Sequence, residues 1–255
     1  MIPPMLIQKL IMRTYLYLRY FFHMITRTGT FGPNRASQIL TLHGESDNPL
    51  KDALFRHHVK QFHESSCSVA SVVSIINAIL QKDQPLNLPP ITQQGILEKV
   101  RAAHWKERMG AKGYRGKRGL PLTVLAQVVK ASLGAYGIDY KYLETVQAQR
   151  GDKLSNPIRK TLLARLKQFE TQGNCLILAH FDQGSFVREL NIPHISPVGG
   201  FDPKTLKITL LDVDQSQTHP YEVSFDTFYR GISTDYNQMF KLFGFGRGGY
   251  IFIQL

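Results

Sequence analysis

The sequence predicts an α+β fold with an antiparallel sheet. Segments with helical periodicity and few breakers dominate the first two thirds of the 255-residue chain. The last third instead holds short apolar or alternating runs separated by Gly, Pro, Asp and Asn. Helices followed by strands, without regular alternation of the two, is the pattern of α+β proteins. With 43% hydrophobic residues and no internal repeat, the chain is expected to build one main globular domain.

A basic amphipathic helix is predicted at the start, because residues 1–44 contain no Asp or Glu. At 100° per residue, one side of this helix carries Ile7, Ile11, Leu18, Phe21, Phe22 and Ile25, and the other carries Lys9, Arg13 and Arg27. Charges at positions 9, 13 and 19 disfavour a transmembrane helix, and no clean cleavage site indicates a secretory signal. Gly29, Gly32 and Pro33 should end the helix.

We therefore predict two parts: an N-terminal segment, 1–33, and a globular domain, 39–255. For residues 1–28 three roles stay open, namely contact with a membrane surface, targeting, or packing on the domain itself. The localisation is correspondingly open between cytoplasmic and membrane-associated.

The next elements along the chain are a strand, a turn and a helix. ILTLH (39–43) alternates like a strand, and GESDNP (44–49) indicates a turn or a helix start. The run 66–81 has the length and composition of a helix, and the prolines of DQPLNLPP (83–90) require a loop after it.

The middle of the chain predicts a loop and two further helices. The basic, glycine-rich segment 101–119 indicates a mobile surface loop. Pro121 and Gly134 frame a helix over 122–133, and GIDYKYLE (137–144) should be a strand. Another helix is expected from Pro157 to about residue 170, capped by Ser155 or Asn156 and stopped by Gly173.

Four strands are predicted in the last third, at 175–181, 194–201, 206–214 and 250–255. GFGRGG (244–249) fits G-x-G-x-x-G by letter. We reject it as a dinucleotide site, because no strand–helix context surrounds it.

The net charge and the cysteine count limit which binding partners and metal sites are expected. A net charge of +12 favours polyanions, anionic lipid or small carboxylates. Nucleic acid is not expected, because the basic loop matches no recognition module and its single Trp105 is a poor stacking platform. Two cysteines, Cys67 and Cys175, allow at most one disulfide and form no thiolate metal cage, so no metal site and no tightly bound cofactor are predicted.

Cys67 is the candidate nucleophile, because it stands where the polar segment becomes the apolar helix 66–81. The unpaired N–H groups at a helix N-terminus favour a thiolate, and Ser65 and Ser66 are natural caps for such a boundary. The alternative is a small core residue. Cys175, inside NCLILAHF, is expected to be such a core residue.

A thiolate enzyme also needs a histidine, a group that orients it and an oxyanion donor. His194 opens a predicted strand 194 − 67 = 127 residues downstream, while His57, His58 and His63 are assigned to the surface without a role. Asp212 and Asp214 share one strand parity, so geometry leaves both open as the orienting carboxylate. Gln61, six residues before the cysteine, is the candidate oxyanion donor.

These residues resemble a known family. QFHESSCSVASVVSIINAI (61–79) is similar to the nucleophile segment of the phytochelatin synthase family, in which Gln61, Cys67, Ala70, Ser71, Asn77 and Ala78 match. HISPVGGFDPKTLKITLLDVD (194–214) resembles the family's His-Phe/Ile-Ser-Pro…Leu-Asp-Val block, and this match selects Asp212 over Asp214. Weaker similarity extends from about residue 39 to the end.

The resemblance implies a papain-like fold, with Cys67 on a helical lobe and His194 and Asp212 on a sheet lobe. It also implies glutathione as substrate, cut at its Cys–Gly bond to give a γ-glutamylcysteinyl thioester and glycine. Water then gives hydrolysis, and a second glutathione gives a phytochelatin. A heavy-metal ion would enter as a thiolate complex of the substrate.

The sequence also departs from the family pattern. DVDQSQTHPY (212–221) lacks the arginine expected after the aspartate, Ser68 and Pro193 stand where glycines are usual, and the Cys-rich C-terminal extension is missing. Hydrolase and transferase therefore both stay open, as do two alternatives. One is a papain-like peptidase or amidase acting on another peptide, and the other a basic membrane-surface protein with a relic triad. The basic loop 101–118 is either a clamp for substrate carboxylates or a solvated loop. Nothing indicates the oligomeric state.

Overall fold

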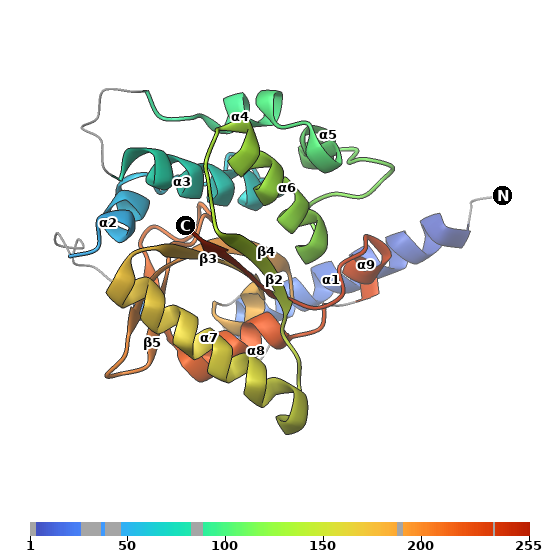
Figure 1. Cartoon of the computed structure of the whole chain (residues 1–255). Helices are drawn as coiled ribbons and strands as arrows, with labels where there is room; N and C mark the ends of the chain where they lie inside the picture. Colours follow the sequence, from blue (N-terminus) through green and yellow to red (C-terminus); the bar gives the residue numbers. More distant parts are fainter. Residues whose placement is uncertain (1–3, 27–36, 39–46, 83–88, 188–190, 237) are drawn as a thin grey trace.

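An antiparallel sheet with helices on both of its faces forms the α+β fold (Figure 1). The computed structural model describes residues 4–26, 37–38, 47–82, 89–187, 191–236 and 238–255. Its sheet has seven strands in the order β1-β6-β5-β4-β3-β7-β2, and every neighbouring pair is antiparallel. The strands are β1 (Ser37–Gln38), β2 (Tyr142–Gln147), β3 (Cys175–Asp182), β4 (Pro193–Asp202), β5 (Lys207–Leu210), β6 (Tyr221–Ser224) and β7 (Gly249–Gln254).

The helices divide between the two faces of the sheet. Figure 1 shows α3 and α6 on one side of the central strands and α7 and α8 on the other. Strands β3 and β7 are consequently buried at every residue. The helices are α1 (Pro4–Thr26), α2 (Pro49–Arg56), α3 (Cys67–Gln81), α4 (Gln93–Lys99), α5 (Trp105–Met109), α6 (Leu122–Ala135), α7 (Asp152–Gln172), α8 (Phe225–Ser233) and α9 (Gln238–Leu242), with short 3-10 turns at Ala102–His104 and Gln183–Ser185.

Most predicted elements are present, and the errors lie at their ends. Helix α3 and strands β3, β4 and β7 fall where expected. Helix α7 begins at Asp152, five residues earlier than predicted, because Pro157 in its second turn removes only one intrahelical hydrogen bond. It stops at Gly173 in the left-handed conformation, as predicted. The strand placed at 137–144 instead forms over Tyr142–Gln147.

Helix α6 runs past the predicted stop at Gly134 and ends after Ala135. The glycine with positive φ is Gly137 (φ 64°), and the helix end is closed by the Tyr136 N–H, which donates to carbonyls of the last turn. The strand predicted at 39–43 and most of the loop at 83–90 lie outside the described residues.

The segment 101–119 is not simply a surface loop. It contains the 3-10 turn and α5, and Trp105 is fully buried, so the indole offers no surface for stacking on a nucleic-acid base. The Trp105 Nε1–H donates to Ser68 Oγ at 3.1 Å. The prediction of a surface loop was therefore wrong for the first half of this segment.

Helix α1 confirms the helix predicted near the start, and it ends at Thr26. In the described part of the chain, no helix has both the length and the apolarity required to cross a bilayer.

Candidate active site

Cys67 is the first residue of α3, and its side chain is buried apart from 8% of its surface. Ser66 occupies the N-cap position, but the predicted capping is wrong, because Ser66 makes no side-chain cap hydrogen bond. Its hydroxyl turns back to His63, donating to the carbonyl at 2.7 Å and accepting from the N–H at 3.0 Å. The first-turn N–H groups beside Cys67 therefore receive no acceptor from the Ser66 side chain.

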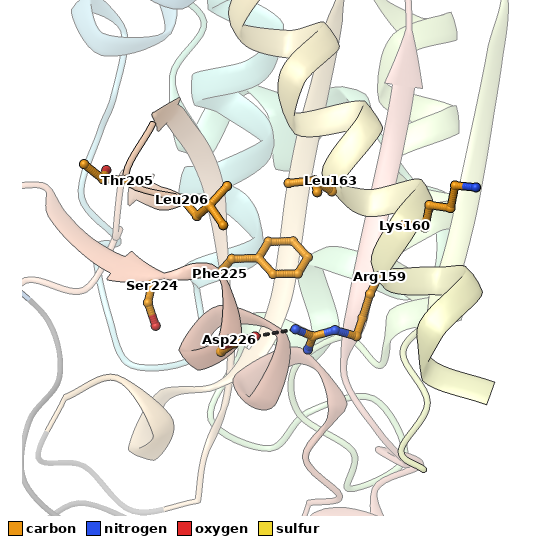
Figure 2. Close-up of a pocket in the computed structure, with 8 residues that line it drawn as sticks. All are labelled: Arg159, Lys160, Leu163, Thr205, Leu206, Ser224, Phe225 and Asp226. Carbon is orange, nitrogen blue, oxygen red and sulfur yellow. Dashed lines mark hydrogen bonds and ion pairs between the residues drawn. The ribbon is translucent and has the colours of Figure 1, made fainter. Parts of the chain in front are cut away.

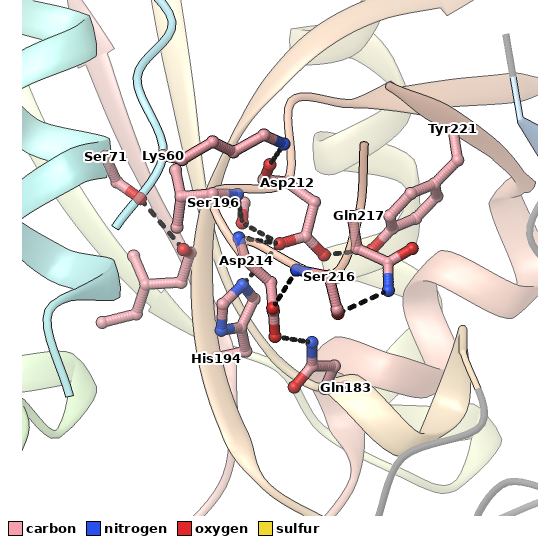
Figure 3. A network of polar contacts seen from close by, with 12 residues as sticks. Lys60, Ser71, Gln183, His194, Ser196, Asp212, Asp214, Ser216, Gln217 and Tyr221 are labelled. Atoms are coloured by element: carbon pink, nitrogen blue, oxygen red, sulfur yellow. Dashed lines mark hydrogen bonds and ion pairs between the residues drawn. The ribbon is translucent and has the colours of Figure 1, made fainter. Parts of the chain in front are cut away.

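A side-chain hydrogen bond holds α3 against the sheet at the level of the site. Ser71, one turn after Cys67, donates from Oγ to the carbonyl of Ile195 at 2.9 Å (Figure 3). Ile195 follows His194 on β4. This contact consequently fixes the cysteine helix and the histidine strand relative to each other.

His194 and Asp212 form a buried pair. Nε2 of the ring lies 2.6 Å from Asp212 Oδ1, and the two residues are 4% and 0% exposed (Figure 3). Because a carboxylate only accepts, Nε2 carries the proton, which leaves Nδ1 for the thiol of Cys67. Oδ1 of Asp212 also accepts from the Asp214 N–H at 2.9 Å, and Oδ2 accepts from the Tyr221 hydroxyl at 2.6 Å.

The two carboxylates that the residue pattern could not separate differ in their contacts. Asp214 accepts from Gln183 Nε2 at 2.7 Å and from the Ser216 N–H at 2.8 Å, and it has no bond to the histidine. The strand β5 ends at Leu210, so neither aspartate belongs to the sheet. Strand parity therefore did not apply to them.

The charges of the pair stabilise each other. Burial would lower the pKa of His194, but the Asp212 carboxylate and then Cys67, by hydrogen bonding and charge, raise it well above the ordinary value. Burial would likewise raise the pKa of Asp212, but His194, Tyr221 and the Asp214 N–H hold it well below its usual range. The arrangement favours an imidazolium beside the buried carboxylate, with Cys67 next to it.

Gln61 is tied to the segment that carries Asp212. Its N–H donates to the Val213 carbonyl at 2.8 Å, and its carbonyl accepts from Gln215 Nε2 at 2.7 Å. The side chain is 7% exposed, and its Oε1 is buried without a hydrogen-bond partner among the described residues. The atom left unpaired is the amide oxygen, which only accepts, whereas an oxyanion would need the Nε2 donor of the same side chain.

Several residues near the site carried no signal in the sequence. Tyr221 is the first residue of β6. Lys60 donates from Nζ to the Asp212 carbonyl at 2.5 Å. Tyr236 is 1% exposed, and its hydroxyl oxygen lies 2.7 Å from Nδ1 of His180. The Lys60 and Tyr236 contacts join residues that are 152 and 56 positions apart in the chain.

The histidines before Cys67 also differ from expectation. His57 is buried, and Nε2 of both His57 and His58 is buried without a hydrogen-bond partner among the described residues. Burial, and then the charge of Lys60, lowers the pKa of His58 to about 4. The placement of His57 at the surface was wrong, and burial, and then the charge of Arg56, lowers its pKa as well. His58 is partly buried.

The basic segment reaches the start of α3. Arg118 donates from Nη2 to Ser65 Oγ, two residues before Cys67. Lys60 thus places one cation at the Asp212 backbone, and Arg118 places another in the segment just before Cys67.

Neither cysteine is in a disulfide. Cys175 is fully buried, which confirms the core prediction, and burial raises the pKa of its thiol to about 12. Within the described ranges, no cluster of three or more His, Cys, Asp or Glu side chains has the arrangement needed to hold a metal ion.

A cavity of about 530 Å³ lies elsewhere, beside α7 and α8 (Figure 2). Its lining includes Arg159, which is paired with Asp226, and the apolar side chains of Leu163 and Phe225. None of the candidate site residues lines it.

One comparison with known protein families found a match. A family model described as phytochelatin synthase matches residues 51–245, which is 195 of the 255 residues. The matched range includes Gln61, Cys67, His194 and Asp212 and excludes α1. A comparison with curated proteins gave no match.

Proposed function

This chain belongs to the phytochelatin synthase family, and from that premise we propose that it cleaves the Cys–Gly bond of glutathione with Cys67 as the nucleophile. The family match implies activity of the glutathione γ-glutamylcysteinyltransferase type. The finer roles follow from the contacts of the site. The observation that supports them best is the His194–Asp212 hydrogen bond of 2.6 Å beside the thiol of Cys67.

In the first step, the Cys67 thiolate attacks the carbonyl carbon of the Cys–Gly peptide bond. The N–H groups at the start of α3 and the Gln61 amide stabilise the oxyanion of the tetrahedral intermediate. His194 then gives its proton to the departing nitrogen, so that glycine leaves and a γ-glutamylcysteinyl thioester remains on Cys67. Asp212 keeps the ring oriented and charged until the proton moves.

In the second step, His194 acts as the base. It takes a proton from water, giving γ-glutamylcysteine, or from the α-amine of a second glutathione, giving a phytochelatin. In both cases the new bond forms at the thioester carbon and the Cys67 sulfur leaves. A heavy-metal ion takes part as the thiolate complex of the substrate, and we assign no tightly bound cofactor to the protein.

We also assign the family's papain-like arrangement to the chain, with α3 on the helical lobe and β4 on the sheet lobe. Lys60 and Arg118 are placed to attract the carboxylates of glutathione, which is an anion at neutral pH. These two cations stand near the site even though no arginine follows Asp212 in the sequence.

Intact-mass spectrometry after mixing with glutathione tests the first step. Wild-type protein should gain the mass of one γ-glutamylcysteinyl group and release glycine, whereas Cys67→Ala should do neither. Cys175→Ala is the matched control, because it removes the other cysteine, which is buried in β3, and should keep the adduct.

Product analysis separates the remaining possibilities. γ-Glutamylcysteine alone indicates a hydrolase, and longer (γ-Glu-Cys) oligomers indicate the transferase. If glycine release from glutathione is absent while another peptide in a panel is cut by wild-type but not by Cys67→Ala protein, the substrate assignment is wrong. If Cys67→Ala releases as much glycine as wild type, the nucleophile assignment is wrong.

A further inference from the structure

Helix α1 presents an apolar face to solvent. The described chain has fourteen exposed large hydrophobic residues, and nine of them are on this one helix. Six are more than 60% exposed, in the middle and at the end of the face: Leu10, Ile11, Leu18, Phe21, Phe22 and Ile25. Such a contiguous patch marks an interaction surface, whereas single exposed apolar residues do not.

The face is continuous around the helix. At 100° per residue, the nine exposed apolar residues occupy an arc of about 160°. Within this arc the only polar residue between positions 7 and 25 is Thr14, and its hydroxyl donates to the Leu10 carbonyl at 3.0 Å. The polar group is thus satisfied inside the helix, as required next to an apolar medium.

The margins of the face combine tyrosine and arginine. Tyr15 and Tyr17 stand at opposite edges of the arc, the guanidinium of Arg19 lies 5.9 Å from the Tyr15 ring centre, and that of Arg13 lies 5.6 Å from the Tyr17 ring centre. Arg13 also donates to the Tyr17 hydroxyl at 3.4 Å. Amphipathic rings and long basic side chains at the border of an apolar face are suited to the boundary between lipid chains and headgroups.

The positive charge of α1 indicates what binds its apolar face. Positions 4–26 contain Lys9, Arg13 and Arg19 and no acidic residue, and the chain as a whole carries a net charge of +12. A second copy of this helix would bring the same positive charges, which repel. An anionic bilayer surface supplies both the apolar phase and the opposite charge.

We propose that α1 binds flat on the surface of an anionic membrane, with its apolar face at the acyl boundary and its arginines at the headgroup phosphates. Figure 1 shows the N-terminal half of α1 extending beyond the rest of the fold, next to α9. The match to the family model begins at residue 51, so this inference is independent of the proposed function.

Co-sedimentation of the full chain with vesicles tests the proposal, using phosphatidylcholine mixed with phosphatidylserine and phosphatidylcholine alone. Wild-type protein should bind the mixed vesicles, and raised salt should weaken the binding. Leu18→Glu and Phe21→Glu should each weaken it at least about tenfold, because an apolar anchor is lost and a charge is buried. Loss of Arg13 or Arg19 should cost roughly fivefold each.

Leu206→Glu is the matched control, because it makes the same change at an exposed leucine outside α1 and should bind as wild type does. Three results would overturn the proposal: no binding to mixed vesicles at low salt, equal binding by Leu18→Glu, or equal binding to phosphatidylcholine alone. An α1-dependent dimer in sedimentation velocity, without vesicle binding, would overturn it in favour of a second copy.

Discussion

Replacing Asp212 by Asn tests the electrostatic basis of the site. The substitution keeps the size of the side chain and an oxygen that can accept from the Nε2–H of His194, but it removes the negative charge. At an effective dielectric constant of 20, two unit charges about 4 Å apart interact by ~4 kcal/mol. With Nε2 and Oδ1 2.6 Å apart, the charge centres of this pair lie at about that separation.

Loss of ~4 kcal/mol corresponds to about a thousandfold smaller population of the imidazolium. The pKa of His194 should fall, because burial is then opposed only by Cys67. The imidazolium next to Cys67 should therefore be scarce at neutral pH in the variant. Alkylation of Cys67 by iodoacetamide should become slow near pH 7 and recover only in alkaline solution.

The assay is selective because Cys175 is fully buried and has a pKa raised to about 12. Asp214→Asn is the matched control, since this carboxylate bonds to Gln183 and Ser216 rather than to His194. Its alkylation profile should stay within a few fold of wild type. Wild-type alkylation near pH 7 by Asp212→Asn protein would refute the reasoning.

Three further changes probe the acid response, the oxyanion and the core. Burial lowers the pKa of His180 from 6.5 to about 4, so stability is lost as pH falls through this window, by up to about 3 kcal/mol. His180→Gln should flatten that loss in denaturant titrations, and an unchanged acid limb would contradict the assignment. Gln61→Ala should lower kcat for glycine release about 10²–10³-fold. Its alkylation of Cys67 by iodoacetamide should be unchanged, because alkylation develops no oxyanion. Equal loss in both assays would indicate a structural role for Gln61. Trp105→Phe removes the hydrogen bond to Ser68 and should lower the free energy of unfolding by about 1–3 kcal/mol, measured by circular dichroism in urea, whereas wild-type stability would show that the indole contact contributes little.

The sequence predicted those parts of the site that depend on local pattern. Cys67 was found because a polar segment meets an apolar helical run there, and the helix begins at that residue. His194 was found because a strand opens beside it. Asp212 was selected by the family resemblance and not by strand parity, since β5 had already ended at Leu210. The catalytic roles of Cys67, His194 and Asp212 stay predictions.

Contacts between distant segments were beyond the sequence. Tyr221 pairs with Leu210 across the β5–β6 ladder, which brings its hydroxyl to the carboxylate just after β5. That register depends on the turn between the strands, and DQSQTHP does not specify it. The predicted end of α6 was wrong for a local reason instead. Gly134 is tolerated inside the helix, and the glycine with positive φ is Gly137.

The buried pair has a physical cost that bears on its purpose. Removing an aspartate and a histidine from water is expensive, and apolar side chains of similar volume often stabilise a core at least as well. Here the cost is offset by donors placed around one carboxylate, since Asp212 accepts from His194, the Asp214 N–H and Tyr221. Such donors hold a negative charge in one position beside the imidazole, and the imidazole in turn adjoins the thiol. Stability alone does not require this arrangement, whereas a nucleophile that must be a thiolate at neutral pH does.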